Sequence, residues 1–89
     1  MLNNKTVLIT GGTGSFGKGC AIYLLKKFNL KKLIIFSRDE LKQFHMSNEL
    51  ENIKKNTKLR FFLGDVRDRE RLFLAFKKVD YVIHAAALK

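Results

Sequence analysis

The sequence predicts an α/β fold built on a parallel sheet, with the strands in the order 3-2-1-4. Short apolar runs alternate with longer amphipathic stretches along the 89 residues, which gives the element order β-α-β-α-β-α-β. Strands that alternate with helices pair in parallel through right-handed crossovers. A glycine-rich turn, TGGTGSFG, follows the first apolar run at residues 10–17, and the chain contains no proline, which suits regular elements.

The first strand is expected at residues 6–10 (TVLIT), because a nearly continuous apolar run is typical of a strand buried on both faces. The apolar residues of 15–28 recur at helical spacing and trace one helical face. They are Phe16, Cys20, Ala21, Leu24, Leu25 and Phe28. Asn29 is the expected left-handed C-cap of this helix.

The second strand is expected at residues 32–37 (KLIIFS), and a helix follows it. Ser37 and Glu40 have the spacing of a capping box, which predicts that this helix starts at Ser37. Its apolar side chains are expected to face the core. They are Leu41, Phe44, Met46, Leu50 and Ile53.

The third strand is expected at residues 59–64 (LRFFLG), followed by a helix over 68–79 and a fourth strand over 80–87 (DYVIHAAA). One side of the helix is apolar and is expected to pack against the sheet. It carries Leu72, Ala75, Phe76 and Val79. The chain reaches its last residue directly after the fourth strand. An apolar sheet edge would then stay open, so we expect residues 1–89 to be the front part of a longer domain.

The glycine-rich turn predicts an anion site. Read from Gly12 it is G-x-G-x-x-G, and read from Gly11 it is G-x-x-G-x-x-G, with Gly14 and Gly17 in both patterns. Between a buried strand and a helix, such a turn presents backbone N–H groups and the positive end of the helix dipole to a phosphate. A merely tight turn is the simpler alternative. A phosphate loop of the G-x-x-x-x-G-K-[ST] type is a decoy here, because Gly19 stands where the magnesium ligand belongs.

The net charge of +10 favours anionic partners such as nucleic acid, a membrane surface or a phosphorylated ligand. The lysines, however, come as scattered pairs near the ends of expected helices, where cations complement the helix dipole. The pairs are Lys26–Lys27, Lys31–Lys32, Lys54–Lys55 and Lys77–Lys78. Charges placed in this way are typical of solvated faces, so nucleic acid is not the expected partner.

Cys20 is the one cysteine, which excludes an internal disulfide and fits a reducing compartment. The first apolar stretch is too short for a signal peptide, and no stretch approaches the length of a membrane span. The expected location is therefore the cytoplasm, with no membrane partner.

The end of the second strand indicates which dinucleotide the turn binds. An acid at this place signals NAD, whereas an arginine accommodates the 2′-phosphate of NADP. Ser37 and Arg38 stand there, which favours NADP, while Asp39 one residue later keeps NAD as the alternative. Asp39 has the simpler role of a negative charge at a helix start. Lys42 is either a second cation for the phosphate or an exposed helix lysine.

Two further strand ends carry candidate groups. Asp65 follows the third strand, where its carboxylate could accept from an adenine amino group with Val66 against the ring; a turn or N-cap is the simpler role. Small residues from Ala85 onward suit a close approach to a flat ligand, or tight packing. His84 is expected to be a packed histidine, because nothing in the sequence pairs with it.

Four stretches together resemble a known family: TGGTGSFG, SRDELKQ, GDVRD and HAAALK. The first fits the T-G-x-x-G-x-x-G signature of extended short-chain dehydrogenase/reductases, which makes Gly11, Gly14 and Gly17 the working glycines and Gly12 and Thr13 a variable pair. All four resemble the inverting UDP-N-acetylglucosamine 4,6-dehydratases of the polysaccharide-biosynthesis group. The resemblance runs across the whole chain and implies a partial Rossmann fold.

The resemblance also implies an activity. Such enzymes hold NADP tightly, oxidise C4 of a UDP-sugar, eliminate water across C5–C6, return the hydride to C6 and invert C5. Their keto-deoxy products serve surface glycans or nonulosonic acids. Members of the family usually form homo-oligomers, often hexamers, in the cytoplasm.

Carried onto this sequence, the resemblance implies a cofactor site made of three groups and one residue toward the UDP-sugar. The pyrophosphate group is Gly11, Thr13, Gly14, Ser15, Phe16 and Gly17. The 2′-phosphate group is Ser37, Arg38, Asp39, Glu40, Leu41 and Lys42, and the adenine group is Asp65 and Val66. Ala85 lies along the cofactor, and Lys89 reaches toward the substrate.

The catalytic residues of the family, including its Tyr-x-x-x-Lys segment, follow the next strand, so none is expected in residues 1–89. Tyr23 and Lys27 have this spacing, but they lie on the first helix and the match is accidental. The chain is therefore expected to be inactive alone. Two other functions stay open: a standalone nucleotide-binding module, and a basic nucleic-acid-binding protein.

Overall fold

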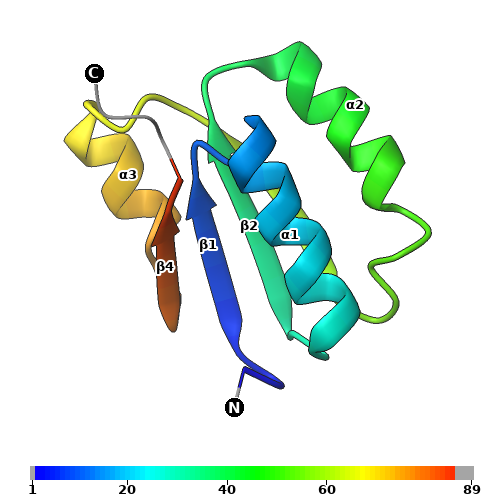
Figure 1. Ribbon diagram of the computed structural model, residues 1–89. Coiled ribbons are helices and arrows are strands. Elements are labelled where there is room, and N and C mark those ends of the chain that lie inside the picture. The colour runs from blue at the N-terminus through cyan, green and yellow to red at the C-terminus, as the bar shows by residue number, and fades with distance from the viewer. Residues whose placement is uncertain (1, 86–89) are drawn as a thin grey trace.

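The computed structural model describes residues 2–85. Strands and helices alternate along the chain (Figure 1). The strands are β1 (Thr6–Thr10), β2 (Lys32–Ser37), β3 (Lys58–Leu63) and β4 (Tyr81–His84). The helices are α1 (Ser15–Lys27), α2 (Glu40–Leu50) and α3 (Arg69–Ala75). Among the described residues no helix has the length and apolarity that a membrane span requires.

The four strands form one parallel sheet in the order β3-β2-β1-β4, which confirms the predicted fold class. Thr10, the last residue of β1, lies opposite Phe36 on β2 and His84 on β4. The strand order reverses at β1, because the chain first adds strands on one side of β1 and then crosses to the other. In parallel α/β sheets, ligands bind outside the carboxyl ends of the strands at such a reversal.

Helices cover both faces of the sheet (Figure 1). On one face α1 and α2 pack through residues such as Leu25 and Leu50 against Val7 and Ile9 of β1. On the other face α3 packs with Leu8, Ile34 and Phe36. The central strands β1 and β2 are buried almost throughout. Helices cover both faces of this parallel sheet, so both faces of each central strand are buried. The strands are therefore continuously apolar instead of alternating between apolar and polar residues.

The start of α2 differs from the prediction. Ser37 is the last residue of β2 and is buried, so it does not cap the helix. Asp39 is the N-cap instead, and its Oδ1 accepts from the backbone N–H of Lys42 at 3.0 Å. The capping box was therefore wrong by two residues, since an Asp nearer the helix satisfies the same free N–H groups.

The buried face of α2 also differs from the prediction. Leu41 and Phe44 were expected in the core, but they are 64% and 61% exposed. Gln43, Met46 and Leu50 face the sheet instead, at the i, i+3, i+7 spacing of a single helical face. Ile53 lies beyond the helix and packs against the core as a partly buried residue. The predicted buried face of α2 thus left out a polar residue, Gln43.

Four smaller expectations, two for the first helix and two for the last elements, are also corrected. The C-cap of α1 is Phe28 rather than Asn29, and Phe16 is 65% exposed instead of buried. The third helix and fourth strand are shorter than expected. Leu72, Ala75, Phe76 and Val79 pack together against the sheet as predicted. Residues 86 and 87 of the expected strand lie outside the described residues.

Candidate functional site

The turn between β1 and α1 depends on two glycines in the ways that the sequence predicted. Gly11 has a φ of 64°, a left-handed conformation that favours glycine, and its N–H donates to the Phe36 carbonyl at 2.8 Å. A Cβ on Gly17 would lie 2.6 Å from both the Gly11 carbonyl oxygen and the Gly12 Cα. Gly17 therefore lets the first turn of the helix rest directly on the loop.

Gly12 is not a free position in this chain. A Cβ there would lie 2.7 Å from Cγ2 of Ile35 and 3.2 Å from the Ile9 carbonyl oxygen. Both neighbours belong to the buried centre of the sheet and cannot withdraw cheaply. The expectation that Gly12 is variable is therefore wrong in this fold, because a side chain there would have to displace the buried Ile35.

The N-terminus of α1 is left without a cap, unlike those of the other two helices. Its N-cap, Gly14, makes no side-chain hydrogen bond, and the first turn holds no acidic residue. In contrast, Asp39 caps α2 and Asp68 caps α3, each with a glutamate in the first turn. The first N–H groups of a helix have no partner within it. At α1 they stay available to an anionic ligand.

Gly14 also leaves room for that ligand. A Cβ on Gly14 would come no closer to another part of the protein than 3.6 Å, to the Gly11 carbonyl oxygen. Fold packing therefore does not require glycine at this position, in contrast to Gly12 and Gly17. The donor set and the open space fit the pyrophosphate of a dinucleotide. Thr13, Ser15 and Phe16 complete the loop; Ser15 and Phe16 are exposed and Thr13 is half-buried.

Lys18 does not serve the loop. Its Nζ lies 3.2 Å from each carboxylate oxygen of Glu49, so the side chain reaches from α1 to α2 and not toward the glycine loop. A phosphate loop would direct this lysine at the phosphates. Together with glycine at position 19, this contact argues against the NTPase alternative.

At the end of β2 the Ser37 hydroxyl is engaged inside the fold. Its Oγ accepts from Nε2 of Gln43 at 2.9 Å, and the same amide reaches the Phe62 carbonyl at 3.2 Å. Gln43 thus joins α2 to the ends of β2 and β3. Sequence reasoning missed Gln43, although its helical spacing from Met46 and Leu50 was a usable signal.

Arg38 and Asp65 come together from the ends of β2 and β3. Nη1 of Arg38 lies 3.6 Å from Oδ2 of Asp65. Arg67 binds the same carboxylate more closely, with Nη2 at 2.8 Å from Oδ2 and Nε at 3.2 Å from Oδ1. The Arg67 backbone N–H also donates to Oδ1 at 2.9 Å. Sequence analysis did not single out Arg67, although it stands within the quoted GDVRD stretch.

These contacts change the electrostatics of the carboxylate. Hydrogen bonds from the Arg67 side chain and backbone hold the pKa of Asp65 well below its usual range, and the charges of Arg67 and Arg38 add to this. Asp65 in turn raises the pKa of Arg67. The carboxylate therefore stays ionised, as an acceptor of hydrogen bonds, throughout the neutral range.

The remaining candidates of the adenosine region lie around these groups. Glu40, Leu41 and Lys42 are exposed in the first turn of α2, while Asp39 uses one carboxylate oxygen as the helix cap. Val66 packs against the cluster beneath α3 as a partly buried residue. The structure thus brings the starts of α2 and of the β3–α3 loop to one edge of the sheet.

His84 and Ala85 lie where β4 meets the end of β1. Nδ1 of His84 is 2.6 Å from the Thr10 hydroxyl oxygen, and the Ala85 N–H donates to the Thr10 carbonyl at 2.9 Å. His84 is exposed, so the expected packed histidine is corrected: it has a partner, but its ring also faces solvent. Lys89 lies outside the described residues.

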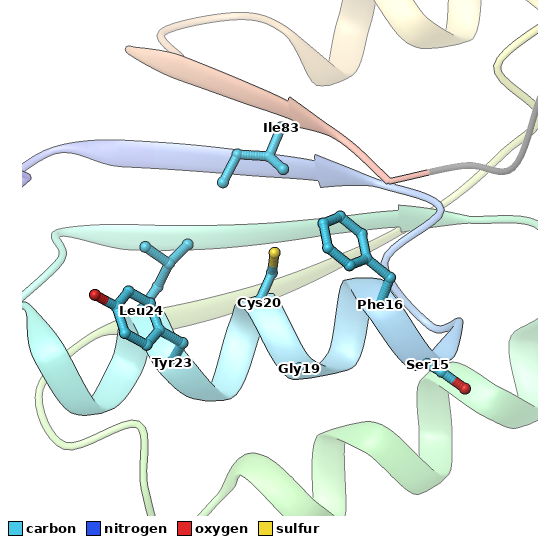
Figure 2. A pocket seen from close by; sticks show the side chains of 7 residues that line it. All are labelled: Ser15, Phe16, Gly19, Cys20, Tyr23, Leu24 and Ile83. Atoms are coloured by element: carbon cyan, nitrogen blue, oxygen red, sulfur yellow. The ribbon is translucent and has the colours of Figure 1, made fainter.

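An apolar hollow lies on the side of α1 that faces β4 (Figure 2). Phe16, Cys20 and Leu24 point from the helix toward the sheet, and Ile83 lines the β4 side. Tyr23 also lines the hollow and is 59% exposed. The described residues that line it are uncharged, whereas the uncapped N–H groups lie at the loop before the first turn of α1.

A family model described as polysaccharide biosynthesis protein matches residues 7–89. UDP-N-acetylglucosamine 4,6-dehydratase (inverting) of Campylobacter jejuni (serotype O:23/36, strain 81-176) is 56% identical over 89 residues, which are 100% of this chain and 25% of that protein. UDP-glucose 4-epimerase of Rickettsia bellii (strain OSU 85-389) is 49% identical over 92 residues, which cover 100% of this chain and 26% of that protein.

Among solved structures, a short-chain type dehydrogenase/reductase from Mycobacterium ulcerans matches with a TM-score of 0.85 at 23% identity, over 99% of this chain and 34% of that chain. This likeness shows the fold alone. The resemblance to the inverting dehydratases, expected from four sequence motifs, is confirmed at the level of the matched residues. The chain spans about a quarter of the length of the curated relatives it matches.

Proposed function

The chain belongs to the polysaccharide biosynthesis protein family, and from this premise we propose that residues 1–89 are the N-terminal part of an NADP-binding Rossmann domain. The glycine loop holds the pyrophosphate, and the ends of β2 and β3 hold the adenosine. Nucleotides bind at this edge of open α/β sheets, where the strand order reverses. A short-chain type dehydrogenase/reductase from Mycobacterium ulcerans shares the fold.

One observation carries the proposal: of the three helices in the described chain, α1 alone begins without an acidic cap. Two helices of this small protein satisfy their first N–H groups with aspartate. At α1 the residue in that place is Gly14, whose missing side chain leaves both the N–H groups and the space above them open. A bound phosphate supplies the negative charge that the other helices obtain from their own residues.

The pyrophosphate is held mainly by backbone. Gly11 sets the turn, Gly17 sets the approach of the helix, and the N–H groups of the loop and first helical turn are the donors. Ser15 adds an exposed hydroxyl. The residues assigned to this role are Gly11, Thr13, Gly14, Ser15, Phe16 and Gly17.

The 2′-phosphate of NADP is assigned to Arg38, with Lys42 as a second cation. Both side chains are exposed, Arg38 just before α2 and Lys42 in its first turn, and within residues 2–85 the ion pair of Arg38 is the 3.6 Å contact with Asp65. Asp39 does not oppose this assignment, because its carboxylate faces the helix as a cap. The Ser37 hydroxyl contributes by fixing the loop through Gln43. This placement supports NADP over NAD as the preferred cofactor.

The adenine is assigned to Asp65 and Val66. The carboxylate stays ionised and is held in a fixed orientation by hydrogen bonds from Arg67 to both of its oxygens. The adenine amino group therefore finds an oriented acceptor. Ala85, next to Thr10 at the end of β4, gives the cofactor a small neighbour where it passes the sheet.

For the whole protein we propose the activity of an inverting UDP-N-acetylglucosamine 4,6-dehydratase. When bound, NADP would accept a hydride from the sugar and later return it to the sugar. Residues 1–89 contribute binding and orientation, and Lys89 reaches toward the UDP-sugar. No proton acceptor for the C4 hydroxyl is assigned within this chain, so we expect it to be inactive alone. A homo-oligomer in the cytoplasm is the expected setting, and the free thiol of Cys20 fits a reducing compartment.

A second candidate function has support from one observation, the 49% identity to a protein named UDP-glucose 4-epimerase. Product analysis separates the two activities. The 4,6-dehydratase product has lost one water from the UDP-sugar, which mass spectrometry detects as a loss of about 18 mass units. An epimerase product keeps the mass of its substrate and differs only in configuration.

Cofactor titration tests the binding function directly. We expect NADP to bind more tightly than NAD, and both to bind more tightly than ATP with Mg²⁺, measured by calorimetry on the same preparation. A preference for ATP with Mg²⁺ would favour the phosphate-loop alternative and overturn the proposal. Retention on duplex DNA with a steep salt dependence, in the absence of dinucleotide binding, would favour the nucleic-acid alternative.

A further inference from the structure

We propose that Arg67 is a specificity-determining positioning residue, which keeps Asp65 from capturing Arg38 and so leaves Arg38 available to the 2′-phosphate. The inference rests on the proposed function, because it assigns a mechanism to the preference of the same site for NADP. Nothing in the sequence motifs had singled out Arg67.

The geometry around the carboxylate is unequal. Arg67 makes four hydrogen bonds to Asp65: Nη2 at 2.8 Å from Oδ2, Nε at 3.2 Å from Oδ1 and 3.3 Å from Oδ2, and its backbone N–H at 2.9 Å from Oδ1. Arg38 makes one contact, at 3.6 Å, which is longer than a hydrogen bond. Both guanidinium groups therefore contact the same carboxylate. Arg67 forms hydrogen bonds with it, whereas Arg38 lies at the distance of a long ion pair.

This sharing matters because Asp65 and the phosphate compete for Arg38. A free aspartate beside an arginine forms a bidentate pair, with two parallel N–H···O bonds. Such a pair would have to break before Arg38 could bind a phosphate. Since Arg67 already occupies both oxygens of Asp65, Arg38 keeps only a long ion pair of 3.6 Å with that carboxylate, and its side chain is 72% exposed.

Arg71 cannot replace Arg67 in this role. Its Nε donates to the Leu63 carbonyl at 2.7 Å, and its guanidinium lies 4.5 Å from the centroid of the Phe62 ring. Within residues 2–85, the ion pairs of Asp65 are those with Arg38 and Arg67. Removing Arg67 therefore leaves Arg38 as the partner of the carboxylate.

The test compares two probes that differ only in the phosphate of interest, adenosine 2′,5′-bisphosphate and 5′-AMP. Their dissociation constants are measured by NMR titration of the ¹⁵N-labelled protein, and their ratio is the selectivity. We expect Arg67→Ala to lower the selectivity about threefold to fivefold, the range of a modest charge interaction. Arg69→Ala removes the same charge two residues away and is expected to change the selectivity less than twofold.

A double-mutant cycle shows whether Arg67 acts through Arg38. Arg38→Ala is expected to remove most of the selectivity, and adding Arg67→Ala to it is expected to change nothing further. Arg67→Lys keeps the charge but lacks the fork that spans two oxygens, so an intermediate selectivity is expected. The Nε–H signal of Arg38 gives a direct readout, since it should move in Arg67→Ala before any ligand is added.

The outcomes distinguish the inference from its premise. If Arg38→Ala lowers the selectivity and Arg67→Ala does not, the premise stands and the role of Arg67 is overturned. Equal effects of Arg67→Ala and Arg69→Ala would also overturn it, because general charge would explain both. If Arg38→Ala itself leaves the selectivity unchanged, the 2′-phosphate assignment fails, and the inference fails with it.

Discussion

The hydroxyl oxygen of Thr10 lies 2.6 Å from Nδ1 of His84, and this hydrogen bond joins the carboxyl ends of β1 and β4. Both residues stand immediately before the segments that approach the cofactor in the proposed function, which begin at Gly11 after β1 and at Ala85 after β4. Thr10 is buried and His84 is exposed. The pair therefore links β1 to β4 at the point where the strand order reverses.

Replacing Thr10 by valine tests this pair. Thr10→Val keeps the shape of the side chain and removes the hydroxyl, so we expect it to lower the free energy of unfolding by about 1 kcal/mol. Urea denaturation followed by circular dichroism measures the change. Combined with His84→Ala, the two substitutions should show a coupling energy of about 1 kcal/mol. Fully additive effects would mean that the contact contributes nothing.

Gln43 is expected to be the residue of α2 whose polarity matters most. Gln43→Leu removes the bonds to Ser37 and to the Phe62 carbonyl at similar side-chain volume, so we expect a loss of about 1–3 kcal/mol in unfolding free energy. Leu41→Gln is the control, because it makes the opposite exchange of an apolar for a polar side chain at an exposed position of the same helix. Because Leu41 is 64% exposed, its replacement should change stability by less than about 0.5 kcal/mol. A larger cost for Leu41→Gln than for Gln43→Leu would contradict the observed orientation of the helix.

Asp65 should make stability depend on acid pH. Its pKa is lowered in the folded protein, chiefly by hydrogen bonds from Arg67, so the folded state prefers the ionised form more than the unfolded state does. The resulting stabilisation is complete above about pH 4, the ordinary carboxyl range, and is lost as the pH falls further. Asp65→Asn lacks this contribution. The difference in stability between the natural protein and Asp65→Asn should therefore shrink below about pH 4, as thermal melts across pH would show. A constant difference would contradict the prediction.

Local sequence patterns were sufficient to predict the order and type of the elements. The apolar runs of β1 and β2 predict buried strands, and the turn glycines predict the start of α1. Contacts with other elements do not change these predictions. The orientation of α2 was not predictable in the same way, because Leu41 and Phe44 mimic a core stripe while Gln43 is buried. Which face a helix buries is decided by packing on the sheet, and a polar residue is accepted there when its hydrogen bonds are satisfied.

The candidate site was likewise predictable only in part: its backbone turn followed from the sequence, but contacts between distant segments did not. Gly11 and Gly17 perform the roles that their spacing indicated, since backbone conformation and close packing follow directly from a missing side chain. Gly12 was wrongly considered variable, because its constraint comes from Ile35 on another strand. Arg67 was not singled out, since its importance depends on where its side chain meets Asp65. Contacts between distant segments were thus the part that spacing alone could not supply.

The proposed function requires that the uncapped N-terminus of α1 binds the pyrophosphate, and Gly14→Asp is designed to block that site. Aspartate fits at Gly14, which has a φ of −73° and no close neighbour, and aspartate is a favoured N-cap. Gly19→Asp, on the exposed side of the same helix, is the charge-matched control, since a Cβ there meets nothing within 4 Å.

The measurement is the dissociation constant of NADP, with thermal stability recorded for each variant. We predict that Gly14→Asp keeps or slightly raises the melting temperature and weakens NADP binding about tenfold or more, because its carboxylate occupies the N–H groups and repels the phosphates. Gly19→Asp should bind NADP within about threefold of the natural protein, since the effect of a charge on the helix terminus fades beyond the first turn. Unchanged NADP affinity in a folded Gly14→Asp protein would contradict the claim.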